Sequence, residues 1–132
     1  MKTRLIISTI IILFSISLHA QDSDQVMSQI KAAIKSMNAS ALASHFSDRI
    51  DLETPGIDGS YSKNQAEVII NDFFKKEPLK SFTINHQGSS NDGSKYMIGT
   101  YINKSDKEYR VYILIKISGD NFKINQLQFE ED

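Results

Sequence analysis

The spacing of apolar residues changes near residue 81, from the period of a helix to the period of a strand. Before that point, apolar positions recur every three or four residues in three segments, 26–37, 41–46 and 66–74. After it, apolar and polar residues alternate in four runs, 82–88, 95–103, 108–117 and 122–130, which turn-forming Asn, Asp and Gly residues separate. The pattern predicts three helices followed by four long strands.

Local signals set the ends of these elements. Ser62 and Gln65 have the spacing of a capping box, which would start the third helix at about residue 63. Residues 49–53 alternate as a short strand that stops at Pro55 and Gly56. Because the loops between the four long strands are short, neighbouring strands must run antiparallel. We therefore expect an α+β fold, in which a curved antiparallel sheet, a four-stranded meander plus a short strand, wraps around three N-terminal helices in a cone-like shape.

The alternation also assigns residues to the two faces of the sheet, provided that every turn is symmetric and no bulge intervenes. The face expected to contact the helices is the larger and more aromatic one, comprising Phe82, Ile84, His86, Met97, Gly99, Tyr101, Arg110, Tyr112, Leu114, Leu127 and Phe129. The opposite face would then gather an apolar patch across three neighbouring strands, formed by Ile98, Val111, Ile113 and Ile124.

Four polar groups on the predicted inner face are candidate ligand-binding residues: His86, Tyr101, Arg110 and Tyr112. In the predicted register they would lie in an apolar cleft between the sheet and the helices, which is the usual composition of a small-ligand site. His86 is also the candidate catalytic acid or base, with one of the other three polarising an oxygen. The alternative interpretation is that these groups satisfy one another inside a core and that Arg110 extends to its rim.

The apolar patch on the predicted outer face requires a cover. A second copy of the chain is the simplest one, because a two-fold axis makes a single patch complementary to itself. We therefore expect a homodimer through the outer sheet face. A terminal segment folded across the sheet, or a different strand register, would be the alternative.

The first twenty residues have the form of a secretory signal peptide. Lys2 and Arg4 precede an apolar run at residues 5–18, and a polar stretch follows Ala20. The run is shorter than the roughly 20 residues that a membrane-spanning helix needs. Cleavage after Ala20 would leave residues 21–132 as one domain without a membrane anchor, exported to the periplasm or the extracellular medium. A retained membrane anchor is the alternative.

Composition excludes several classes of chemistry. The chain has no Cys, which excludes a disulfide framework, a thiolate metal site and a thiol nucleophile. His45 and His86, the two histidines beyond the leader, lack the spacing of a zinc site, and we expect neither a metal nor a cofactor. With 15 basic and 16 acidic residues, the chain lacks the charge excess that indicates binding to nucleic acid.

The order of elements resembles that of the nuclear-transport-factor-two-like superfamily, whose members are cone-shaped and often dimerise through their sheets. More narrowly, residues 61–67 (YSKNQAE), 72–74 (DFF), 82–88 (FTINHQG), 96–99 (YMIG) and 109–112 (YRVY) are similar to segments of a family of small exported bacterial proteins of unknown function, typical of the Bacteroidetes group. The superfamily resemblance implies an acid–base pair in its enzyme members, such as ketosteroid isomerase. The predicted inner face here has tyrosines and a histidine but no carboxylate.

These observations favour a non-catalytic exported module, with a cone-shaped pocket that accepts a small apolar ligand or a peptide, or with a surface for another protein. A small-molecule isomerase, dehydratase or hydrolase that uses His86 is one alternative. A structural subunit of a larger exported assembly is another.

Overall fold

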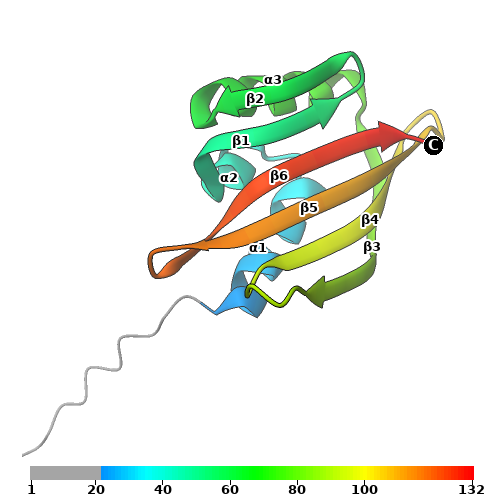
Figure 1. Ribbon diagram of the computed structural model, residues 1–132. Coiled ribbons are helices and arrows are strands. Elements are labelled where there is room, and N and C mark those ends of the chain that lie inside the picture. Colours follow the sequence, from blue (N-terminus) through cyan, green and yellow to red (C-terminus); the bar gives the residue numbers. More distant parts are fainter. Residues whose placement is uncertain (1–21) are drawn as a thin grey trace, which may run out of the picture.

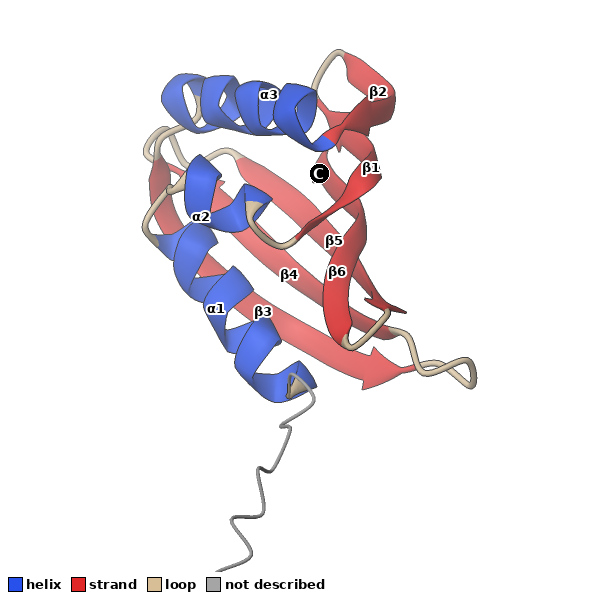
Figure 2. Cartoon of the chain, turned by 90° about the vertical axis from the view of Figure 1, so that its left-hand side faces the viewer, coloured by secondary structure: helices blue, strands red, loops and turns tan. Residues whose placement is uncertain are grey.

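The computed structural model describes residues 22–132, so the predicted leader, residues 1–20, lies outside the described residues. Nine elements follow one another: α1 (Ser23–Lys35), α2 (Ala39–Ala43), β1 (Phe46–Thr54), β2 (Ile57–Ser62), α3 (Lys63–Lys76), β3 (Leu79–Ser89), β4 (Lys95–Asn103), β5 (Glu108–Ser118) and β6 (Asn121–Glu131). The strands form one curved sheet in the order β2-β1-β6-β5-β4-β3. All three helices lie on the same face of that sheet (Figures 1 and 2).

The predicted α+β class and the predicted meander are confirmed, but the sheet has six strands rather than five. The missed strand is β2, which pairs with β1 in an antiparallel hairpin closed at Gly56 (φ 81°). Its sequence alternates weakly, with Ile57 and Tyr61 interrupted by Gly59, and carries no run of β-branched residues. β1 then runs parallel to β6, which joins the hairpin to the meander.

Capping residues fix the ends of the helices. The capping box predicted at Ser62 and Gln65 is present, with both of its hydrogen bonds at 3.3 Å. α1 ends two residues earlier than predicted, because Met37 adopts a left-handed conformation (φ 52°). There the Asn38 amide donates to the Ala33 carbonyl and the Met37 amide to the Ile34 carbonyl, which is the pairing of a Schellman motif.

Aromatic rings fill the space between α3 and the sheet. The Phe73 ring lies 4.6 Å from the ring of Phe129, 5.3 Å from that of Tyr109 and 5.4 Å from that of Tyr101, measured between centroids. Phe74 stacks on Tyr101 at 6.3 Å. All five side chains are buried. The space between α3 and the concave face of the sheet is therefore a packed core, which the burial of large rings stabilises.

Candidate functional site

His86 lies on the outer face of the sheet, away from the helices. Ile84 pairs with Gly99, but His86 pairs with Ile98, so Asn85 is an extra residue in β3. This β-bulge reverses the direction of every later side chain in the strand. The prediction that His86 faces the helices is therefore wrong: its side chain is exposed.

The His86 imidazole has one side-chain partner among the described residues, Tyr96 on β4. Its Nε2 lies 3.0 Å from the Tyr96 hydroxyl oxygen, and the two ring centroids are 5.5 Å apart. The Tyr96 ring covers Gly88, where an added Cβ would lie 2.5 Å from the tyrosine oxygen. The Tyr96 side chain thus extends from β4 over the edge strand β3 and fills the space left by the missing side chain of Gly88.

Arg110 and Tyr112 also lie on the outer face, so their predicted placement is wrong as well. The turn between β4 and β5 has an odd number of residues, 104–106, because the Asn103 amide donates to the Lys107 carbonyl; within it Asp106 has φ 65°. The Asn103 carboxamide oxygen closes this loop by accepting from the amides of Ser105 (2.9 Å) and Lys107 (2.8 Å).

The odd loop shifts the register by one residue, which exchanges the two faces of β5. Tyr101 pairs with Tyr109 rather than with Arg110. The inward residues of β5 are Tyr109, Val111, Ile113 and Ile115, all buried. Ile124 is also buried, because Asn125 is an extra residue between the pairs Ile115–Ile124 and Leu114–Gln126. Of the predicted outer patch, only Ile98 lies on the outer face.

Tyr101 is the one predicted site residue that points toward the helices, and it is wholly buried. Its hydroxyl donates to the Glu77 carbonyl at 2.5 Å, at the end of α3. Burial raises the pKa of Tyr101, and the Glu77 carboxylate and Tyr109 add to the effect. The residue therefore fastens α3 to the sheet, in agreement with the alternative interpretation that it satisfies its polar group inside a core.

Sequence reasoning missed the polar residues around Tyr101. The Glu77 carboxylate accepts a hydrogen bond from the Asn103 side-chain amide, and Tyr109 lies nearby on β5. Burial raises the pKa of Tyr109 to about 12, with the Glu77 carboxylate as the next cause. A correct register of β5 would have placed Tyr109 on the inner face. Glu77 follows two lysines at a helix end and gives no comparable signal in the sequence.

His45, the other histidine within the described residues, lies apart from His86. It lines a groove of about 430 Å³ between α1 and α2, whose other walls are Gln29 and the short side chains of Ala32, Ala33, Ser36, Ala41 and Ser44. Burial lowers the pKa of His45, and the ammonium groups of Lys123 and Lys63 lower it further. The two histidines thus form no common site.

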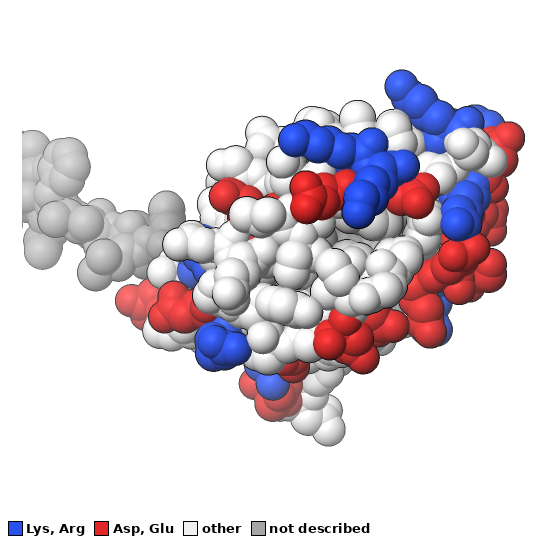
Figure 3. All heavy atoms as spheres, turned by 90° about the horizontal axis from the view of Figure 1, so that it is seen from above, with Lys and Arg blue, Asp and Glu red and all other residues white. Residues whose placement is uncertain are grey.

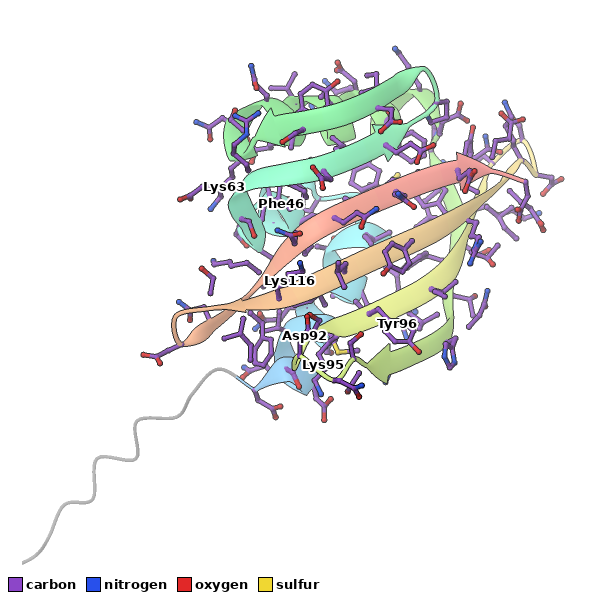
Figure 4. All side chains as sticks on the ribbon, in the orientation of Figure 1. Phe46, Lys63, Asp92, Lys95, Tyr96 and Lys116 are labelled. Carbon is purple, nitrogen blue, oxygen red and sulfur yellow. The ribbon has the colours of Figure 1, made fainter. Side chains whose placement is uncertain are left out.

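The outer face of the sheet carries apolar side chains on its two central meander strands. Five half-buried residues make up what we call the outer patch: Tyr96, Ile98 and Ile102 on β4, and Tyr112 and Leu114 on β5. Tyr96 pairs with Leu114 across the two strands, and Ile98 pairs with Tyr112. Figure 4 shows Tyr96 on this face of β4 and Lys116 farther along β5.

Charges of opposite sign prevail at the two ends of this face, although Arg110 lies opposite Glu130 at one end and Asp92 lies near Lys116 at the other. Arg49, Lys116 and Lys123 occupy the end where β1 and β6 begin, and Lys116 is directly opposite Lys123. Glu53, Asp58, Glu108 and Glu130 occupy the other end, with Glu53 directly opposite Asp58. Figure 3 shows a group of acidic side chains, with basic ones among them, at the end of the molecule away from the grey trace. Like charges that face each other across strands are unfavourable unless a partner compensates them.

Two shallow hollows adjoin the outer patch. One, of about 160 Å³, is lined by Arg110, Tyr112, Gln128 and Glu130. The other, of about 280 Å³, has a mainly polar lining that includes Asp51, Glu53, Asp58 and Gln128. They share Gln128, whereas His86 lines neither of them. The outer face thus offers contact area rather than an enclosed reaction site.

The described residues, 22–132, include neither a metal-binding cluster nor a membrane-spanning helix. No group of three or more His, Asp or Glu side chains within this range is arranged to hold a metal ion. Within the same range, no helix has the length and apolar character that crossing a membrane requires.

The comparisons with known proteins agree with this geometry. The model of a domain of unknown function, DUF4783, matches residues 27–130. A DUF4783 family protein from Bacteroides uniformis superposes with a TM-score of 0.75 at 25% identity, covering 81% of this chain and 97% of that one. One from Bacteroides ovatus gives 0.73 at 24% identity, covering 79% and 93%.

More distant structures share the fold alone. An NTF2-like protein of unknown function from Cytophaga hutchinsonii gives a TM-score of 0.59 at 12% identity, covering 84% of this chain and 90% of that one. No curated protein matches the sequence. The matched proteins therefore supply a family and a fold, and the function has to be inferred from the surface.

Proposed function

The chain belongs to the DUF4783 family, and we propose that it is an exported, non-catalytic protein-interaction module that associates with a second copy of itself through the outer face of its sheet. The observation that carries the proposal is the outer patch, five half-buried apolar residues flanked by opposite charges. An exposed apolar patch bordered by polar residues is typical of a protein interface.

The packing of the interior favours a surface function over an internal ligand pocket. The rings of Phe73, Phe74, Tyr101, Tyr109 and Phe129 occupy the space between α3 and the sheet. A small ligand would have to displace these buried rings, each of which contributes strongly to stability through its burial. Three of the four side chains predicted to line a pocket point away from that interior.

The distribution of charge favours a second copy as the partner. A two-fold axis that lies in the interface and runs perpendicular to the strands reverses the strand direction of one copy relative to the other. It would place the basic end, with Lys116 and Lys123, over the acidic end, with Glu53 and Glu130, of the second copy. The Lys116–Lys123 pair would then face carboxylates of the second copy, and the Glu53–Asp58 pair would face its basic end. Such complementary charges help to fix how the two copies align and which partner is chosen.

The size of the face suits this arrangement. A stable interface buries about 800 Å² on each partner, which is more than five side chains supply. Contact would therefore extend from the outer patch to Gln126 and Gln128 on β6 and to the charged ends. This is the usual composition of an interface, with an apolar centre and a polar rim.

Cysteine labelling tests the position of the interface, because the natural chain has no cysteine. Gln128→Cys places a thiol on the outer face, and Asn71→Cys places a control thiol on the exposed side of α3. We expect maleimide labelling at position 128 to slow as protein concentration rises, whereas labelling at position 71 stays constant. Equal rates at both positions at all concentrations would contradict the proposal.

A further inference from the structure

We infer that His86 makes the association of the two copies sensitive to pH, so that the dimer forms at neutral pH and dissociates in mild acid. This inference rests on the proposed function, since it assigns a regulatory role to a residue of the same face. It starts from the bulge at Asn85, which turns His86 outward onto the face that carries the outer patch.

His86 lies in line with the centre of the patch. It pairs with Ile98, which pairs with Tyr112, which pairs with Gln128, so the four residues form one row across β3, β4, β5 and β6. Three strand spacings make this row about 14 Å long. An interface of about 800 Å² is roughly 28 Å across. A second copy centred on the outer patch would therefore cover His86 as well.

The neighbours of His86 on β4 carry no charge. They are the Tyr96 hydroxyl at 3.0 Å and the apolar side chain of Ile98. The nearest charged group on β5 is Arg110, one row away opposite Thr100, and Arg110 in turn lies opposite Glu130 on β6.

The charged groups of α1 that lie near β3 are on the inner face, away from His86. Asp24 and Lys31 of α1 line a hollow with Gln87 on the inner face. Among residues 22–132, no carboxylate forms an ion pair or a hydrogen bond with His86.

Covering this site with a second copy removes water from the imidazole. A neutral ring keeps its hydrogen bond to Tyr96 and tolerates the apolar surroundings. A protonated ring would be buried without a counter-charge, which is costly. Histidine is the side chain that changes charge between pH 8 and pH 5, and the two-fold axis places one such ring on each copy. Dissociation should therefore follow protonation.

The test measures the dissociation constant of the chain 21–132 at pH 7.5 and pH 5.5 by sedimentation equilibrium. For the natural sequence we expect the constant to rise about tenfold or more at pH 5.5. His86→Gln, which keeps a hydrogen-bonding side chain without a titratable group, should bind equally at both pH values. His45→Gln, the matched control in the groove between α1 and α2, should retain the full pH dependence.

A permanently charged variant separates the effect of His86 from any acid-induced loss of folding. His86→Lys should weaken the dimer at pH 7.5, without any exposure of the protein to acid. A dimer that is equally stable at both pH values, or whose pH dependence persists in His86→Gln, would overturn the role of His86 while leaving the interface intact. A natural chain that is monomeric at pH 7.5 would overturn the proposed function itself.

Discussion

Tyr101 and Tyr109 lie opposite each other on β4 and β5, both wholly buried, yet only the Tyr101 hydroxyl has a hydrogen-bond acceptor within the described residues. The Glu77 carboxylate is near enough to Tyr109 to raise its pKa, but it makes no hydrogen bond of normal geometry with that hydroxyl. Two similar side chains in one core thus differ in whether their polar atom is satisfied.

The two tyrosines should respond differently to removal of the hydroxyl. Tyr101→Phe deprives the Glu77 carbonyl of its donor and should lower the free energy of unfolding by about 1–2 kcal/mol. Tyr109→Phe removes an unsatisfied buried group and should be neutral or slightly stabilising. Urea unfolding of both variants, followed by circular dichroism, makes the comparison. A larger loss for Tyr109→Phe would show that its hydroxyl has a partner after all.

Alkaline pH should destabilise the fold through the same pair. The pKa of Tyr109 is raised from 10.0 to about 12, and that of Tyr101 is also raised, both chiefly by burial. A raised pKa in the folded state means that the stabilisation is complete below pH 10 and is lost as pH rises through 12. Thermal melts between pH 9 and pH 12 should therefore show a falling midpoint. In the double variant Tyr101→Phe, Tyr109→Phe the fall should be smaller.

Two glycines of the sheet offer a matched pair of substitutions. A Cβ at Gly99 would lie 2.6 Å from the Thr83 carbonyl oxygen, which is backbone and cannot move without shifting β3. A Cβ at Gly88 would meet only the end of the Tyr96 side chain, which can rotate away. Gly99→Ala should cost about 2–3 kcal/mol and Gly88→Ala less than about 1 kcal/mol. Equal losses would mean that the Tyr96 ring is as fixed as the backbone.

The sequence predicted the elements well because each is specified locally. The capping box at Ser62, the helical stripe ending in Phe73 and Phe74, and the alternation from residue 82 onward depend only on neighbours along the chain. β2 escaped prediction because a glycine and polar residues interrupt its alternation, so that pairing with β1 and packing against α3 must specify it instead.

The candidate site was harder to predict, because the face assigned to each side chain assumed unbroken alternation across about forty residues of β-strand and turn. One extra residue at Asn85 and one odd loop at Asp106 were enough to exchange the faces of His86, Arg110 and Tyr112. The alternation cannot reveal such shifts, since either parity leaves apolar residues on both faces. Tyr101 kept its predicted face because it pairs with Phe82, a buried residue of β3 that precedes the bulge at Asn85.

The central claim is that the outer patch is an interface between two copies, and sedimentation equilibrium of the chain 21–132 at pH 7.5 tests it most directly. Leu114→Glu puts a charge within the outer patch, and Val68→Glu makes the same kind of change on α3, where the valine is 60% exposed. We predict the mass of two copies for the natural chain and for Val68→Glu, and the mass of one copy for Leu114→Glu. A monomeric natural chain, or a Leu114→Glu variant that remains dimeric, would contradict the account.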